Sequence, residues 1–171
     1  MCPAAPAAGE PGISGFEQTV ARTATLGRIE ERTMSAEENK EVIQRSVEQF
    51  YNTGDLSAID CLYSPTYRDH QSGGTLALEQ FREWARGVFT GIPDLKIIIH
   101  DLHVDGDMVT KRWTAKGTHK GEFLGVPASG NPIDVNGITI YRVQDGKLAE
   151  SWEVMDTFTL MSQMGAVPAP A

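Results

Sequence analysis

Apolar residues follow two different spacings along this chain, one typical of helices and one typical of strands. Between residues 35 and 93 they recur three and four positions apart in three separate runs, which places them on one face of a helix. From residue 94 onward apolar and polar positions tend to alternate, as they do in strands with one buried face. The helical positions are Val42, Ile43, Val47, Phe50 and Tyr51, then Leu56, Ile59 and Leu62, then Leu78, Phe81, Trp84, Ala85, Val88 and Phe89.

The ends of the first two helices carry specific signals. Ser35 and Glu38 form a capping box at the start of the first helix, and Gly54 suits the left-handed position that ends it. Asp55 can cap a short second helix, which Pro65 stops. Residues 67–70 then form a short strand or an exposed loop before the third helix begins.

Four strands are expected in the second half of the chain. The dipeptides Asp105-Gly106 and Asp145-Gly146 are strong hairpin signals, so they predict antiparallel pairing of the strands that they join. In the second strand Val109, Trp113 and Ala115 share one face. The expected strands span residues 95–104, 108–116, 132–143 and 147–155.

This order of elements predicts an α+β fold. Three N-terminal helices would pack on one face of a strongly curved antiparallel sheet. The space between the two layers would then be a blind apolar pocket, which is a common position for a small-molecule site. We expect residues 34–165 to form this domain, with residues 1–33 a flexible extension and residues 166–171 a frayed tail. Residues 160–165 are expected to add one helical turn.

Composition narrows the function classes. The 171 residues carry a formal charge of −8, which argues against binding to nucleic acid or to anionic membranes. The first ten residues lack the positive and apolar regions of a secretion signal, so a cytoplasmic protein is the default expectation.

A metal site is not expected. His100 and His103 flank Asp101, but a separation of three residues on a strand points the two rings to opposite faces. The chain also has no His-Glu-x-x-His pattern on a helix. Nucleotide-binding glycine loops and the Gly-x-Ser-x-Gly pattern of serine hydrolases are missing as well.

Six segments of the chain occur in the same order in one protein family. They resemble the SnoaL-like polyketide cyclases, also called ester cyclases, of the NTF2-like superfamily of α+β cones. The resemblance covers roughly residues 35–165. The segments are Tyr67-Arg-Asp-His70, Gly91-Ile-Pro-Asp-Leu95, Arg112-Trp-Thr114, Gly117-Thr-His-Lys-Gly-Glu-Phe-Leu-Gly-Val-Pro127, Asp145-Gly-Lys147 and Glu150-Ser-Trp-Glu-Val-Met-Asp156.

The resemblance implies an enzyme that closes a ring of a polyketide ester by an intramolecular aldol step, without a cofactor or a metal. In such cyclases an acid on the last strand removes and returns the proton, and by position this acid is Glu153, with Asp156 as a second acid. Some aldol-type members carry a histidine on the preceding strand, where this chain has Thr139. That difference leaves the specific reaction open.

Each candidate also has a structural explanation. Asp156 could cap the last helical turn instead of acting in catalysis, and His119 could satisfy backbone carbonyls beside its glycines. Asp69 and His70 could orient a substrate oxygen or hold their loop, and Trp84 could be core or pocket wall. The remaining substrate-binding candidates are Tyr67, Arg112, Trp113, Thr139 and Trp152.

Three functions remain in competition. The leading hypothesis is a cofactor-independent cyclase, a lyase or isomerase of antibiotic-type polyketide biosynthesis, acting on a small hydrophobic substrate. Hydrolysis or hydroxylation in the same pocket is the second, because this fold hosts several chemistries. The third is a binding or assembly module without catalysis. The fold resemblance implies a homodimer or a higher homo-oligomer, because the outer face of the sheet needs a cover.

Overall fold

The computed structural model describes residues 34–71 and 73–167, so the expectations for residues 1–33 and 168–171 lie outside the described residues. The described part contains one six-stranded sheet with the strand order β2-β1-β6-β5-β4-β3. The strands are β1 (Tyr63–Gln71), β2 (Gly74–Ala77), β3 (Lys96–Asp105), β4 (Met108–Thr118), β5 (Pro132–Gln144) and β6 (Lys147–Met155). The helical elements are α1 (Ala36–Ser46), η1 (Val47–Tyr51), η2 (Leu56–Ala58), α2 (Ile59–Leu62), α3 (Leu78–Gly91) and α4 (Thr157–Met164).

The first helix starts as its sequence predicts. The Ser35 hydroxyl accepts a hydrogen bond from the backbone N–H of Glu38, whose carboxylate accepts one from the N–H of Ser35. At its far end α1 widens into η1, a π-helical turn that brings Tyr51 toward the sheet. Gly54, with φ of +71°, follows this turn in the left-handed conformation.

The three hairpins of the second half are antiparallel, as expected. Asp145 and Gly146 both have positive φ and form a two-residue loop between β5 and β6, which is the geometry that the Asp-Gly signal predicts. The expected antiparallel sheet has one exception, because β1 pairs with β6 in parallel and places Asp69 beside Ser151. This pairing joins strands about 80 residues apart, so no turn signal marks it.

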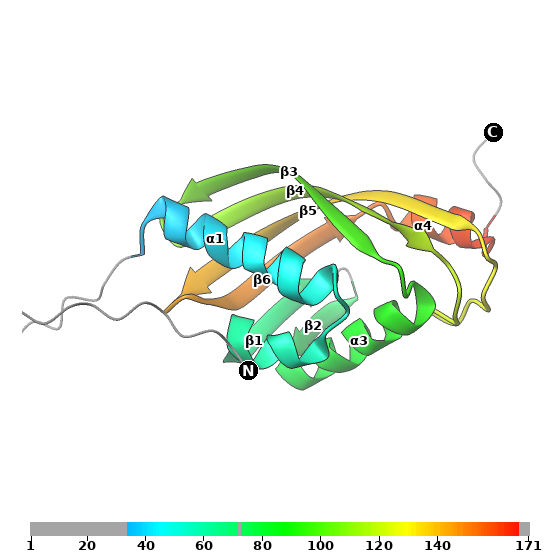
Figure 1. Ribbon diagram of the computed structural model, residues 1–171, viewed down its shortest axis with the longest axis horizontal. Coiled ribbons are helices and arrows are strands. Elements are labelled where there is room, and N and C mark those ends of the chain that lie inside the picture. The colour runs from blue at the N-terminus through cyan, green and yellow to red at the C-terminus, as the bar shows by residue number, and fades with distance from the viewer. Residues whose placement is uncertain (1–33, 72, 168–171) are drawn as a thin grey trace, which may run out of the picture. The chain divides into compact units, whose positions relative to one another are not determined.

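The C-terminal helix is longer than the single turn that we expect from sequence. It runs for eight residues, its N-cap is Asp156, and Gly165 ends it with φ of +85°. It packs against β5, at one end of the sheet (Figure 1). The described part therefore has helical elements both before and after the strands.

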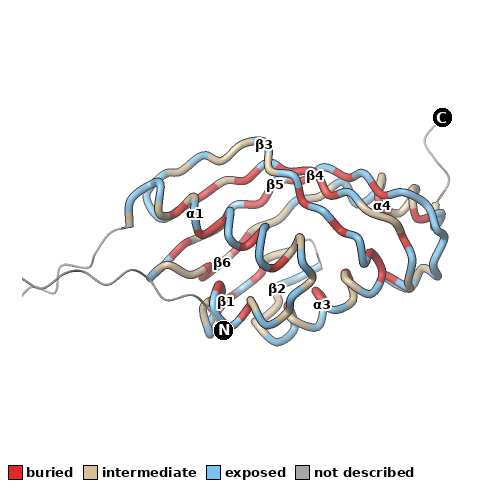
Figure 2. The backbone as a smooth tube through the Cα atoms, in the orientation of Figure 1, coloured by how far each residue is buried: buried red, intermediate tan, exposed pale blue. Residues whose placement is uncertain are grey.

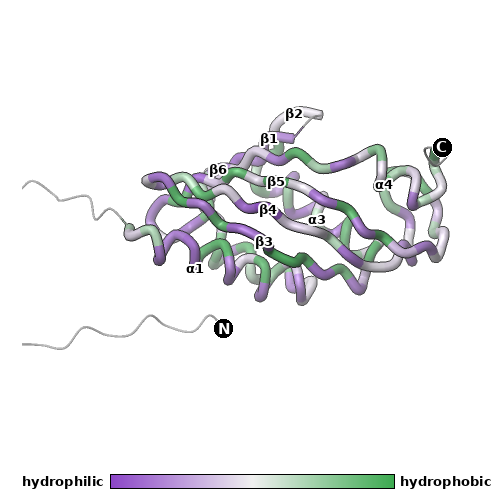
Figure 3. Tube along the Cα trace, turned by 90° about the horizontal axis from the view of Figure 1, so that it is seen from above, coloured by the Kyte–Doolittle hydropathy of each residue, from purple (hydrophilic) through white to green (hydrophobic). Residues whose placement is uncertain are grey.

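The two faces of the sheet differ in burial. Buried and exposed positions alternate along β5 (Figure 2), but the hydropathy of the chain (Figure 3) does not follow this alternation in the middle of the strand, where Ile138 and Ile140 are exposed and Thr139 is buried. The inner face packs against α1 and α3, which lie on the same side of the sheet (Figure 1), and this packing forms the core. The predicted α+β architecture, with helices over one face of a curved sheet, is confirmed.

Candidate active site

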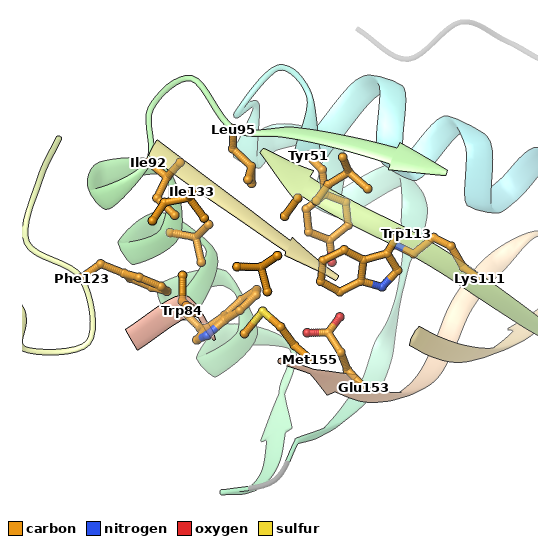
Figure 4. Close-up of a pocket in the computed structure, with 15 residues that line it drawn as sticks. Tyr51, Trp84, Ile92, Leu95, Lys111, Trp113, Phe123, Ile133, Glu153 and Met155 are labelled. Carbon is orange, nitrogen blue, oxygen red and sulfur yellow. The ribbon is translucent and has the colours of Figure 1, made fainter. Parts of the chain in front are cut away.

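A cavity lies between the inner face of the sheet and the helical layer. The empty space is about 570 Å³ when the open mouth is counted with it. Figure 4 shows the side chains that surround it, most of them aliphatic or aromatic. They are Tyr51, Trp84, Val88, Ile92, Leu95, Ile97, Lys111, Trp113, Ala115, Phe123, Ile133, Val135, Glu153, Met155 and Leu160.

Glu153 supplies the only carboxylate among these lining residues. It stands on β6 beside Thr139 of β5, and its carboxylate lies next to Trp113 and Met155 in Figure 4. The indole N–H of Trp113 donates to Thr139 Oγ1 at 2.8 Å, and that hydroxyl donates to Glu153 Oε2 at 3.1 Å. The relay fixes one carboxylate oxygen. No residue in the described ranges donates a hydrogen bond to the other one, Oε1.

The surroundings of Glu153 favour its protonated form more than water would. Burial raises its pKa above the ordinary value, because desolvation penalises the anion. The positive charge of Lys111 opposes this shift, the negative charge of Asp69 adds to it, and the hydrogen bond from Thr139 opposes it more weakly. The net result is a carboxyl group whose pKa is raised toward the range of a general base.

Lys111 is the site residue that the sequence reasoning missed. It stands on β4, is 2% exposed and lines the same cavity as Glu153. Its Nζ donates a hydrogen bond of 3.0 Å to the hydroxyl of Tyr141. Three aromatic rings surround the amine, with centroids 5.1 Å away in Tyr141, 5.2 Å in Tyr51 and 5.6 Å in Trp113.

The alternation of faces along β4 indicated that Lys111 is on the buried side of the strand. Val109 and Trp113 are two residues before and after it, and both were expected on the buried face. A lysine at such a position either reaches solvent past its neighbours or is held inside. Here the aromatic cage holds it inside, and desolvation lowers its pKa to about 8, with Glu153 opposing the shift.

A second buried acid lies close to the cavity without lining it. Asp69 Oδ1 accepts a hydrogen bond of 2.5 Å from the hydroxyl of Ser151, which is 2.6 Å from the hydroxyl of Tyr67. Its other oxygen accepts from Gln71 at 2.6 Å. Burial raises the pKa of Asp69, and these hydrogen bonds oppose the shift. Both carboxylate oxygens are therefore engaged by protein groups.

Apart from Thr139, five of the predicted substrate-binding residues do not line the cavity; they are Tyr67, Asp69, His70, Arg112 and Trp152. His70 stacks on the indole of Trp152 with ring centroids 5.1 Å apart, and its Nε2 is 3.3 Å from Glu150. Arg112 forms an ion pair with Asp101. None of these side chains lines the cavity that contains Glu153. Trp84, Trp113 and Glu153 do line it, and Thr139 touches it through its hydrogen bond to Glu153.

The other two catalytic candidates also lie outside the cavity lining. Asp156 is exposed and caps α4 by accepting from the backbone and hydroxyl of Thr159, which lowers its pKa. His119 is fully buried in the loop after β4, where Nδ1 is 3.1 Å from the Ser129 hydroxyl. Its Nε2 has no hydrogen-bond partner in the described structure. Asp156 thus caps α4, which is the structural alternative considered for it, whereas no backbone carbonyl of the described residues accepts a hydrogen bond from the His119 ring.

Two features are absent from the residues that the structure describes. No group of three or more histidine, cysteine, aspartate or glutamate side chains is arranged to hold a metal ion. No helix within the same ranges is long and apolar enough to cross a membrane.

Comparisons with known proteins agree with the fold. The family model of the SnoaL-like polyketide cyclases matches residues 41–164. A proposed SnoaL-like cyclase from Jannaschia sp. CCS1 is 26% identical, with 77% of this chain and 94% of that chain covered and a TM-score of 0.71. AclR, a proposed hydroxylase from Streptomyces galilaeus, is 27% identical, with coverages of 80% and 87% and a TM-score of 0.74.

IdmH, a proposed polyketide cyclase from Streptomyces antibioticus, is 28% identical over 74% of this chain and 98% of its own, with a TM-score of 0.66. No curated protein sequence matches significantly.

Proposed function

Because this chain belongs to the SnoaL-like polyketide cyclase family, we propose that it is a cofactor-independent cyclase in which Glu153 acts as the general base. Its substrate would be a small hydrophobic, polyketide-like molecule with an enolisable carbonyl group. The reaction would be an intramolecular ring closure or a related isomerisation.

One observation carries this proposal. Among the described residues that line the largely apolar cavity, Glu153 is the single carboxylate, it is oriented by Thr139, and its pKa is raised. A base of this kind can remove a proton from the carbon next to a carbonyl at neutral pH. The apolar walls keep water away from the resulting enolate, so the enolate can attack a second carbonyl of the same substrate.

A second candidate function is hydroxylation. AclR, whose TM-score of 0.74 exceeds those of the two cyclases compared above, is described as a proposed hydroxylase. Uptake of ¹⁸O from ¹⁸O₂ into a turnover product would favour hydroxylation, whereas a cyclase forms its product without gaining oxygen. Ligand binding without any turnover would favour the non-catalytic module.

The cyclase proposal can be tested before its natural substrate is known. The probe is 2-tetralone, a bicyclic ketone with exchangeable protons beside its carbonyl. Wild-type protein is expected to accelerate the incorporation of deuterium from D₂O at the carbons next to the carbonyl. Proton NMR measures this rate. Glu153→Gln is expected to reduce the protein-dependent rate by about 10²- to 10⁴-fold, which is the usual contribution of a general base.

The matched control is Glu150→Gln, on the same strand. Glu150 does not line the cavity, and its carboxylate binds Arg142. We expect this variant to retain the exchange rate of the wild type. Equal loss in both variants, or no loss in Glu153→Gln, would remove Glu153 from the proposed mechanism.

We also propose that the protein is a cytoplasmic homodimer that pairs through the outer face of its sheet. Ile98, Ile138, Ile140 and Val154 are exposed there, at 42%, 47%, 38% and 72%. Ile138 is directly opposite Val154 in the β5–β6 pair and shares a face of β5 with Ile140, so these three side chains form one apolar area, here called the outer-face patch. A second copy related by a two-fold axis would cover the patch with the same residues.

A further inference from the structure

The least expected group in the cavity is the amine of Lys111. A buried lysine is rare unless a carboxylate pairs with it. Among residues 34–71 and 73–167, Lys111 forms no ion pair, and its one hydrogen-bond acceptor is Tyr141. An ammonium group has three donors, so two of them have no protein acceptor in this part of the chain.

The aromatic cage explains how a cation is tolerated at this position. Tyr51 from η1, Trp113 from β4 and Tyr141 from β5 place the faces of their rings within 6 Å of Nζ. Such rings attract a cation more strongly when water is excluded. They cannot accept the two remaining hydrogen bonds in the way that an oxygen anion does. In Figure 4 the Lys111 side chain extends toward Tyr51 and Trp113 on the side of the cavity that also holds Glu153.

Lys111 and Glu153 are oppositely charged groups that line the same cavity without touching each other. Each lines the cavity, and each influences the pKa of the other, yet they do not approach to the distance of an ion pair. A carbonyl oxygen and the carbon that loses its proton are two bonds apart in an enolisable substrate. The protein group that takes the proton and the protein group that binds the oxygen must therefore lie at different points around the substrate.

We propose that Lys111 is a second catalytic residue, whose ammonium group binds the substrate carbonyl oxygen and stabilises the enolate oxygen. This inference rests on the proposed function and adds the group that receives the developing negative charge. The carbon–hydrogen bond breaks and its proton passes to Glu153. The electron pair moves through the carbon–carbon bond to the carbonyl oxygen, beside Lys111, which keeps its own protons.

The physical reason is the low polarity of the cavity. A preorganised cation next to a developing oxyanion acts more strongly in a water-excluded site than in water. General base catalysis alone accounts for about 10²- to 10⁴-fold of a typical enzymatic acceleration, so a cyclase needs a further source of stabilisation. Lys111 is the only cationic side chain among the residues that line the cavity.

The test uses an enolate mimic whose ionisation is visible. The oxygen of 2-naphthol carries a negative charge only when ionised, and the ionised form has its own absorption and fluorescence. The measurement compares Glu153→Gln, which removes the competing anion, with the double variant Glu153→Gln/Lys111→Met. We expect the apparent pKa of bound 2-naphthol to be at least one unit lower when Lys111 is present, which is about a tenfold change in the ionised fraction.

Naphthalene, which cannot ionise, is the control ligand. Equal affinity of both variants for naphthalene would show that the cavity is intact. If the methionine variant does not fold, Lys111→Gln replaces it, because the amide keeps a polar end without the charge. An equal ionised fraction with and without Lys111 would overturn the proposal. The readout needs no turnover, so this outcome is independent of whether Glu153 catalyses exchange of 2-tetralone.

Discussion

Lys111 shows how one residue can lower stability while serving a site. Burial lowers its pKa from 10.5 to about 8, which corresponds to about 3 kcal/mol of unfavourable free energy for the charged form. Below pH 8 the lysine is protonated in both the folded and the unfolded protein, so the folded state carries the whole cost. Between pH 8 and 10.5 the unfolded state binds more protons, and the stability of the folded state rises with pH.

Lys111→Met is therefore expected to stabilise the protein at pH 7, by about 1–3 kcal/mol once the lost cation–π contacts are subtracted. Urea denaturation of both proteins from pH 7 to 10.5 measures the difference. Buried tyrosines near the site also affect stability at high pH, but they affect both proteins. The advantage of the variant should shrink through pH 8–10.5. A variant that is less stable at pH 7 would contradict this account of Lys111.

At the same scale, sequence identified Glu153 but not its partner. Glu153 follows from the family resemblance alone, because neither face of β6 is cleanly apolar and alternation does not decide which face lines the cavity. Lys111 was missed although alternation along β4 places it on the buried face, because a charged residue is usually assigned to the solvent-exposed surface. The positions of His70 and Asp156 depend on contacts with Trp152 and Thr159, and the choice between their alternative roles needed coordinates.

Among the elements, the loop after β4 closes one end of the cavity. The backbone N–H groups of Lys120 and Gly121 donate to the carbonyl of Gly91 at the end of α3. The same loop supplies Phe123 to the cavity wall. A Cβ on Gly91 would lie 2.5 Å from the Cβ of Phe123, so the close packing of helix and loop requires a glycine there.

Helix α3 offers a matched pair of substitutions. Gly91→Ala is expected to lower the free energy of unfolding by about 1–3 kcal/mol, because the new methyl group displaces the loop. It should also weaken naphthalene binding by moving Phe123. Gly87→Ala is expected to raise stability by about 0.5–1 kcal/mol, since nothing lies within 4 Å of the new Cβ and alanine favours the helix.

Denaturant midpoints of the two variants measure the contrast. If both glycine-to-alanine variants shifted the free energy of unfolding in the same direction, the packing described for the loop would be contradicted.

Element by element, local signals predicted more than distant ones. The capping box at Ser35, the glycine after η1 and the Asp145-Gly146 hairpin are all encoded within a few residues, and all are present. The parallel pairing of β1 with β6 and the length of α4 were not predicted. Both depend on tertiary packing, since the partner strand lies far along the chain and α4 is stabilised against β5.

At the scale of the whole molecule, the outer-face patch predicts self-association. Val154→Lys places a charge at the most exposed of its residues, and the resulting repulsion and desolvation are expected to convert the proposed dimer into a monomer. Light scattering coupled to size-exclusion chromatography at micromolar concentration measures this. Leu124→Lys is the control, because Leu124 is 53% exposed but lies in the loop after β4. A monomeric wild-type protein would contradict the dimer.

The dependence of the reaction rate on pH is expected to reflect the protonation states of Glu153 and Lys111. Glu153 acts when it has lost its proton, so the rate should rise with pH through a pKa above the ordinary glutamate value. Lys111 acts when protonated, so the rate should fall again near pH 8. Tyr51 and Tyr141 face Lys111, and burial raises the pKa of each well above its usual value, so both stay neutral. Asp69 is the other nearby acid, and its charge raises the pKa of Glu153.

The most direct test is the rate of deuterium exchange into 2-tetralone from pH 5 to 10, for wild-type protein and Glu153→Gln. We expect a bell-shaped profile for the wild type, and a protein-dependent rate in Glu153→Gln that is about 10²- to 10⁴-fold lower and has lost the acidic limb. An acidic limb that persists in Glu153→Gln, or a rate equal to that of the wild type, would show that another group takes the proton.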